Sequence, residues 1–119
     1  MDLVIGGAYQ GKLDYARNEL HVQETDICDC ASGEADFSKR CLYHYEQYLY
    51  HCVLKGMTPE LPAREDAVVI ADDISCGVVP MDPNVRAWRE LCGRTLTALA
   101  ARSTTVTRLF CGLSRRLKG

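Results

Sequence analysis

The first thirteen residues constrain the fold more than any other stretch of the chain. Leu3-Val4-Ile5 is a short apolar run of the kind that forms a buried strand, and glycines follow it at positions 6, 7 and 11. Lys12 comes next and opens a segment whose apolar residues have helical spacing. A strand, a glycine-rich turn and a helix in this order predict a sheet with helices packed on it.

The same stretch nearly fits the phosphate-binding pattern G-x-x-x-x-G-K-[ST]. Gly6, Gly11 and Lys12 are in register, and glycines let backbone N–H groups curl toward an anion. The last position departs from the pattern, because Leu13 stands where a Ser or Thr hydroxyl would hold Mg²⁺. The predicted phosphate cradle consists of Gly6, Gly7, Ala8, Gly11, Lys12 and Leu13. An ordinary turn between a strand and a helix is the alternative.

Composition narrows the classes of partner. The chain has 119 residues, 47% of them hydrophobic, and a formal net charge of −2, which suits one domain over residues 1–119. Because there is no global excess of basic residues, we do not expect nucleic acid or an anionic membrane to be the main partner. No apolar run approaches the roughly 20 residues of a membrane span. Residues 1–20 lack the pattern of a signal peptide, so the cytoplasm is the expected compartment.

The cysteines favour a reducing environment over a disulfide framework. They are odd in number and irregularly spaced, at positions 28, 30, 41, 52, 76, 92 and 111. We therefore predict reduced thiols that pack in the core. A zinc site built from Cys28, Cys30, Cys41, Cys52, His44 and His51 is the alternative, although no C-x-x-C pair occurs.

Helix and strand signals alternate through the first half of the chain. Helical spacing predicts a helix over residues 12–20, and weaker alternation permits a strand within 22–28. A small, polar stretch at 31–36 predicts a loop, with Ser32 or Asp36 available as a cap. Helical spacing then extends over 37–55, where Gly56 is placed to end the helix.

The second half continues the alternation. A continuous run of mostly β-branched residues at 67–71 predicts a central parallel strand that is buried on both faces. Asp82-Pro83 predicts the start of a helix that runs to about Arg102. Residues 105–110 predict the last strand, and a short basic tail follows it. The fold class that results is α/β, a compact three-layer sandwich with a mostly parallel sheet and right-handed crossovers.

Two further features point to function. Asp72 and Asp73 follow the central strand, and ligands gather at the carboxyl ends of strands in open α/β sheets. We therefore predict that Asp73, or Asp72, binds Mg²⁺ beside the phosphate loop, with a helix cap or turn as the alternative.

Gly93 lies inside the third helix, where glycine costs roughly 1 kcal/mol relative to alanine. Its presence predicts a close approach by another helix or another subunit.

Three motifs of the second half resemble one known family. They are the segment from Val68-Val69-Ile70 to Gly77-Val78-Val79-Pro80, the run Arg86-x-Trp88-Arg89-Glu90-x-x-Gly93-Arg94, and Phe110-Cys111-Gly112-Leu113. Together with the loop near the start, they resemble the bifunctional adenosylcobinamide kinase and adenosylcobinamide-phosphate guanylyltransferase family, over residues 2–20 and 67–118. The run of arginines and glycine is the most specific of these motifs.

The resemblance implies a P-loop NTPase-like fold that binds ATP or GTP with Mg²⁺. It also implies phosphoryl transfer to adenosylcobinamide in cobalamin (vitamin B12) biosynthesis, and a homo-oligomer with Gly93 at the contact. By this resemblance Lys12 holds the phosphates, and Asp73 lies near the nucleotide and the metal; both are the expected catalytic residues.

The chain also departs from this family in its middle. Residues 21–66 lack the histidine that becomes guanylylated in the family and the stretch that follows it. Neither His44 nor His51 is assigned that role, and guanylyltransferase activity is not expected. A catalytically degenerate P-loop protein that binds a nucleotide or a protein partner is the alternative function.

Overall fold

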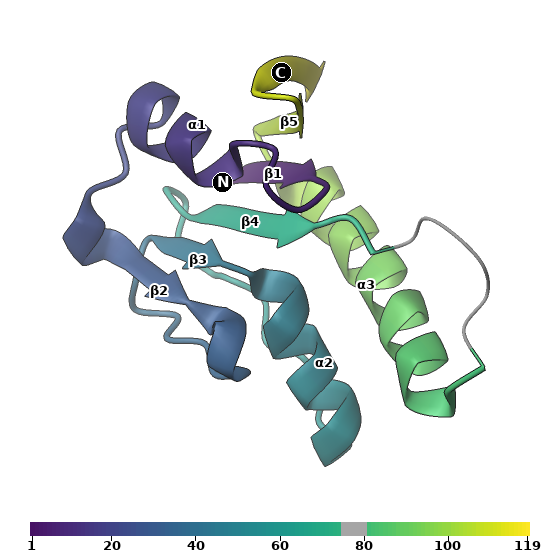
Figure 1. The fold of residues 1–119 in the computed structure, drawn as a ribbon. Coiled ribbons are helices and arrows are strands. Elements are labelled where there is room, and N and C mark those ends of the chain that lie inside the picture. The colour runs from purple at the N-terminus through teal and green to yellow at the C-terminus, as the bar shows by residue number, and fades with distance from the viewer. Residues whose placement is uncertain (75–80) are drawn as a thin grey trace.

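The strands of the computed structural model, which describes residues 1–74 and 81–119, form one six-stranded sheet (Figure 1). Its order is β2-β3-β4-β1-β5-β6. The strands are β1 (Asp2–Gly6), β2 (Ile27–Asp29), β3 (Cys41–Tyr43), β4 (Val68–Asp72), β5 (Thr105–Phe110) and β6 (Leu113–Lys118). Neighbouring strands are parallel except for β6, which runs antiparallel to β5. The predicted α/β class and mostly parallel sheet are confirmed.

Helices cover both faces of this sheet. They are α1 (Lys12–Glu19), α2 (Tyr45–Lys55) and α3 (Pro83–Arg102), with short 3-10 turns η1 (Glu24–Asp26) and η2 (Cys30–Ser32). Residues of β4 alternate between two hydrophobic clusters, because successive side chains of a strand point to opposite faces. Val68 and Ile70 pack on the α1 side, whereas Val69 and Ala71 pack on the side of α2 and α3. Figure 1 shows α1 on one side of the sheet and the other two helices opposite it.

The middle of the sheet fixes where the loop after β1 lies. β1 pairs with β4 on one side and with β5 on the other, and Gly6 aligns with Asp72 and Leu109. A Cβ on Gly6 would lie 2.5 Å from the carbonyl oxygen of Leu109, so only glycine fits there. Because β1 and β4 are parallel, the glycine-rich loop and the acidic pair leave the sheet at the same edge.

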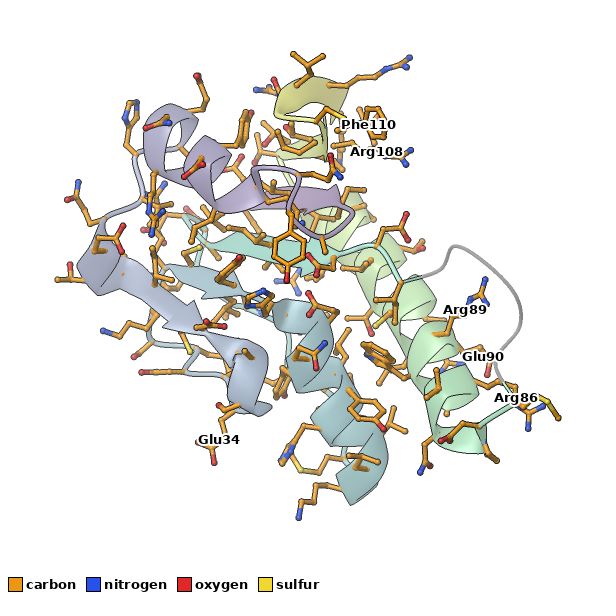
Figure 2. All side chains as sticks on the ribbon, viewed as in Figure 1. Glu34, Arg86, Arg89, Glu90, Arg108 and Phe110 are labelled. Carbon is orange, nitrogen blue, oxygen red and sulfur yellow. The ribbon has the colours of Figure 1, made fainter. Side chains whose placement is uncertain are left out.

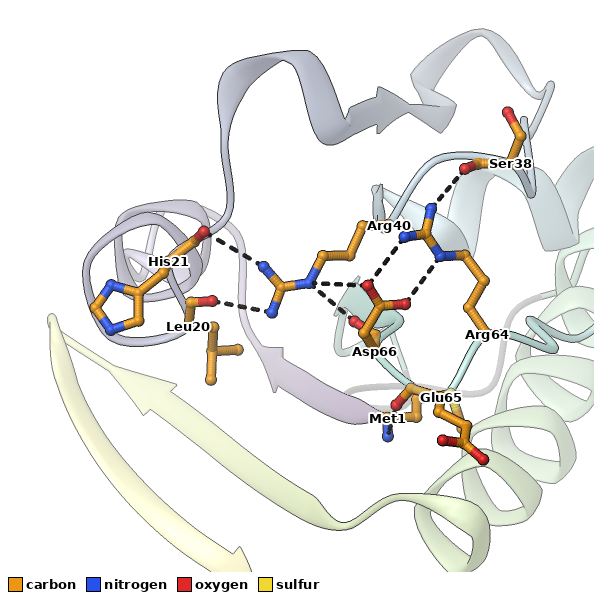
Figure 3. A network of polar contacts seen from close by, with 8 residues as sticks. All are labelled: Met1, Leu20, His21, Ser38, Arg40, Arg64, Glu65 and Asp66. Atoms are coloured by element: carbon orange, nitrogen blue, oxygen red, sulfur yellow. Dashed lines mark hydrogen bonds and ion pairs between the residues drawn. The ribbon is translucent and has the colours of Figure 1, made fainter.

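A polar network lies at the other end of the strands, where β3 and β4 begin (Figure 3). Arg40 donates to the carbonyl oxygens of Leu20 and His21 at the end of α1, and also to that of Asp66 just before β4. Arg64 forms a two-pronged contact with the Asp66 carboxylate, at 2.9 Å for each nitrogen. These contacts hold the amino ends of β3 and β4 in place, at the other end of the strands from the glycine-rich loop.

The prediction of one helix over residues 37–55 is wrong at its first half. Residues Cys41–Tyr43 form β3, and α2 begins only at Tyr45. Cys41 and Leu42 are fully buried on opposite faces of the sheet and align with Val68 and Val69 of β4. Pairing with a buried parallel strand therefore overrides the helical spacing that extends across this segment.

The prediction of a basic tail is also wrong, because residues Leu113–Lys118 form the edge strand β6. The turn at Cys111 and Gly112 brings β6 back along β5. Other boundaries agree with expectation. Asp82 caps α3 by accepting from the N–H groups of Asn84 and Val85, and Gly56 ends α2 in the left-handed conformation.

Some expectations concern residues outside the described parts of the chain. The motif Gly77-Val78-Val79-Pro80 and Cys76 fall within residues 75–80, which the structure does not describe.

The other six cysteines are free thiols, and burial raises the pKa of Cys41 and of Cys92 to about 12. Within residues 1–74 and 81–119, no helix is long and apolar enough to cross a membrane.

Candidate functional site

The loop between β1 and α1 holds a buried lysine. Lys12 is only 5% exposed, yet its side chain lies at the carboxyl edge of the sheet. Its Nζ donates to the carbonyl oxygen of Gly7 at 2.5 Å and lies 2.7 Å from Oδ1 of Asp72. A buried ammonium group needs such partners, because taking a charge out of water without them is costly.

A cavity of about 440 Å³ opens beside this lysine. It is lined by Ala8, Tyr9, Gln10, Gly11, Lys12, Leu13, Asp14, Arg17, Tyr43, His44 and Asp72. The loop and the first turn of α1 form one wall, and the ends of β3 and β4 form the other. This volume lies within the usual range of roughly 300–1,000 Å³ for small-molecule sites.

The backbone of the loop suits an anion. Gly11 adopts a left-handed conformation with φ 90° and caps α1 without a side-chain hydrogen bond. The first N–H groups of a helix carry the positive end of its dipole, and the first residues of α1 line the cavity. The turn between β5 and β6 braces the loop, since the N–H of Gly112 donates to the Gln10 carbonyl at 3.1 Å and that of Cys111 to the Gln10 side chain.

The structure separates the two predicted acidic residues. Asp72 faces the loop, where it pairs with Lys12. Asp73 donates its backbone N–H to the Gly6 carbonyl at 2.8 Å, and the residue lines a different, smaller cavity with Ile5 and Gly93. Asp72 is thus the acidic residue placed beside the glycine-rich loop, and a metal-binding role for Asp73 stays a prediction.

Leu13 occupies the place that the sequence pattern gives to a hydroxyl residue. Its side chain packs against the cluster that contains Ala16 and Ile70, and it also lines the cavity. Mg²⁺ commonly takes one or two carboxylates, with phosphate oxygens and water completing its octahedron. The carboxylate of Asp72 fits that requirement, although no group of three acidic, His or Cys residues suited to a metal exists within the described ranges.

Sequence reasoning missed Glu46, which supports the site from behind. Glu46 is 1% exposed, and its Oε1 accepts the backbone N–H of Asp72 at 2.8 Å. Its Oε2 has no hydrogen-bond partner within the described parts of the chain. Burial raises the pKa of this carboxyl above its ordinary value. Trp88 of α3 donates its indole N–H to the Glu46 carbonyl at 2.7 Å, which ties α3 to the start of α2.

Sequence reasoning placed His44 inside the helix predicted over residues 37–55. In the structure His44 precedes α2 with φ 58°, a left-handed conformation that is uncommon outside glycine. Its Nδ1 lies 2.8 Å from Oδ1 of Asp29, and its ring stacks on Tyr43 with centroids 3.8 Å apart. A signal was present, because His44 directly follows the short strand Cys41–Tyr43, and residues that follow parallel strands gather at one edge of the sheet.

The arginines of the predicted α3 motif lie away from this cavity. Figure 2 shows the side chains of Arg86, Arg89 and Glu90 along the outer side of α3. Around Gly93, on the same helix, no described atom outside the neighbouring residues and backbone of that helix lies within 4 Å of where a Cβ would stand. The close approach that we predicted at Gly93 is therefore not made by the described residues.

No protein-family model matches the chain, and no curated protein matches it. The family resemblance of the sequence motifs thus remains a hypothesis. The assignment of function depends on the loop, the lysine and the cavity.

Proposed function

We propose that this chain is a P-loop protein that binds the triphosphate of ATP or GTP in the loop between β1 and α1. The observation that carries the proposal is the buried Lys12, which pairs with Asp72 at the edge of the 440 Å³ cavity. Strand, glycine loop and helix follow one another, and the neighbouring parallel strand ends in a carboxylate. These are the parts that phosphate binding requires in P-loop proteins.

The two partners of Lys12 define how a ligand would enter. Both are oxygen atoms, the Gly7 carbonyl and an Asp72 carboxylate oxygen. A phosphate oxygen would take the place of the carboxylate oxygen and form another charge-assisted hydrogen bond with Lys12. Asp72, released from the lysine, would then hold Mg²⁺ with the phosphates and water, and that ion would neutralise charge on the phosphates.

We further propose that the bound nucleotide donates a phosphoryl group to a hydroxyl acceptor. The sequence resemblance supplies adenosylcobinamide as the candidate acceptor. Phosphoryl transfer depends mainly on positioning and on neutralising charge, and Lys12 with the loop N–H groups provides both. A second candidate function, a nucleotide-binding module without turnover, is favoured by Leu13, because the chain lacks the hydroxyl ligand at that position.

Two measurements on the purified chain separate these functions. ATP and GTP are titrated with Mg²⁺ by calorimetry, and phosphoryl transfer is followed with radiolabelled nucleotide in the presence and absence of adenosylcobinamide. Binding with transfer to adenosylcobinamide supports the kinase. Binding without any turnover selects the nucleotide-binding module. If neither nucleotide binds at millimolar concentration, the P-loop proposal is wrong.

A further inference from the structure

Three residues outside the phosphate loop form a group at the far wall of the same cavity. His44 and Tyr43 line it together with Lys12 and Asp72, and Asp29 of β2 contacts His44 from behind. The chain thus places a histidine in the wall of the cavity that would hold the nucleotide. No sequence motif of the phosphate loop requires a histidine there.

The contact with Asp29 decides how the ring of His44 is protonated. An ionised carboxylate only accepts hydrogen bonds, so the ring nitrogen 2.8 Å from Oδ1 must carry the proton. That nitrogen is Nδ1. In a neutral imidazole the lone pair then lies on Nε2, and over the described ranges the ring makes its hydrogen bonds through Nδ1 alone. The ring therefore presents a proton acceptor.

The backbone at His44 supports a role for its side chain. Residues before a helix usually accept a hydrogen bond from the first turn, but His44 makes no such cap. Its left-handed conformation costs of order 1 kcal/mol or more for a residue with a Cβ. Glycine or asparagine would suit that backbone better. The histidine is held there by Asp29 and by stacking on Tyr43.

We propose that His44, oriented by Asp29, accepts the proton of the hydroxyl group that attacks the terminal phosphorus of the nucleotide; this inference rests on the proposed function. The acceptor oxygen forms a bond to the γ-phosphorus as its proton passes to Nε2. The bond between that phosphorus and the β,γ-bridging oxygen breaks, and its electron pair leaves with the nucleoside diphosphate. The imidazolium then returns its proton to solvent.

The backbone suggests a variant that should still fold. His44→Gly removes the imidazole and suits φ 58°, so the start of α2 should keep its conformation. His21 offers a matched control, because it has φ 57°, is exposed and does not line the cavity. The assay measures Mg²⁺-dependent phosphoryl transfer from ATP or GTP to adenosylcobinamide and to water, beside nucleotide affinity.

We expect His44→Gly to lower the transfer rate about 100-fold or more, within the range for general base catalysis. The nucleotide affinity of His44→Gly should stay within twofold of native, and added imidazole should restore part of its transfer rate. The control His21→Gly should match the native chain in both rate and affinity. Asp29→Asn should lower kcat less and leave KM unchanged, since Asp29 acts through His44. Transfer within threefold of native in His44→Gly, or a matching loss of nucleotide affinity, would overturn the assignment.

Two further measurements distinguish a failure of this inference from a failure of the proposed function. A non-hydrolysable ATP analogue should protect His44, but not His21, from carbethoxylation by diethyl pyrocarbonate. If the native chain binds the nucleotide but transfers no phosphoryl group, the role of His44 is wrong while nucleotide binding stands. If the analogue binds and leaves His44 as reactive as before, His44 does not face the ligand and the inference is also wrong.

Discussion

The backbone N–H of Asp72 donates a hydrogen bond to the buried carboxylate of Glu46, with 2.8 Å between the two atoms. This contact joins the end of β4 to the first turn of α2, directly behind the ion pair between Asp72 and Lys12. Glu46 therefore controls the position of the acidic residue at the site without entering the cavity lining.

Glu46 should also make stability depend on pH in a definite direction. Burial raises its pKa, so the folded chain binds this proton more tightly than the unfolded chain does. Protonation of Glu46 therefore contributes to the stability of the folded chain. This contribution is complete below pH 4.5, the ordinary glutamate pKa, and it is lost as the pH rises through the raised pKa of Glu46. Glu46→Gln keeps the acceptor for the Asp72 N–H and does not titrate. The advantage of this variant over the native chain should grow as the pH rises above 4.5 and through the raised pKa of Glu46.

Urea unfolding at a series of pH values measures that difference directly. The exposed Glu34, which Figure 2 shows pointing away from the molecule, provides the control substitution Glu34→Gln. That control should keep a constant difference from the native chain. A constant or shrinking difference for Glu46→Gln would show that Glu46 is not a buried, proton-binding carboxyl.

The two adjacent glycines of the loop should respond differently to alanine. At Gly6 a Cβ would lie 2.5 Å from the Leu109 carbonyl oxygen, so Gly6→Ala must push β1 and β5 apart. We expect a loss of about 1–3 kcal/mol in the free energy of unfolding. At Gly7 a Cβ meets only the Gln10 side chain, at 3.7 Å, and Gly7→Ala should stay within about 0.5 kcal/mol of native. Equal effects in thermal unfolding would contradict this packing.

Local patterns in the sequence were enough to predict the central elements. The apolar runs of β1 and β4, the Asp82 cap and Gly56 each act within a few residues, and all are confirmed. β3 was missed because its three residues gain their stability from pairing with β4, a contact between distant parts of the chain. The sequence placed Lys12 beside an acidic residue, but only the alternation of β4 decides that Asp72 faces it. Glu46 and His44 were missed for the same reason, since tertiary contacts define both.

Leu13 offers a test of the metal requirement. Leu13→Ser supplies the hydroxyl ligand that the loop pattern lacks, so Mg²⁺ should strengthen nucleotide binding more in this variant than in the native chain. Leu13→Ala is the matched control, because it removes the same packing against the α1 cluster without adding a ligand. Calorimetric titrations with and without Mg²⁺ compare the three chains. An unchanged magnesium dependence in Leu13→Ser would mean that this side chain does not face the cation.

Gly93 tests the proposal that the chain forms a homo-oligomer through α3. Because no described atom outside the neighbouring residues and backbone of α3 lies within 4 Å of a Cβ at this position, Gly93→Ala should raise the stability of a single subunit by up to about 1 kcal/mol. If a partner subunit packs on Gly93, Gly93→Leu should elute as a folded, smaller species in size-exclusion chromatography. A native chain that is monomeric, or a leucine variant that stays assembled, would contradict the contact.

The affinity of the Lys12→Ala variant for ATP and GTP tests the central claim most directly. Lys55→Ala is the matched control, since Lys55 is an exposed lysine at the end of α2 and away from the cavity. Calorimetry with Mg²⁺ should show native affinity for Lys55→Ala. Lys12→Ala should bind at least about 100-fold more weakly, the loss of roughly 3 kcal/mol expected for a strong hydrogen bond to a charged group. If folded Lys12→Ala binds both nucleotides as tightly as the native chain, the loop between β1 and α1 is not the phosphate site.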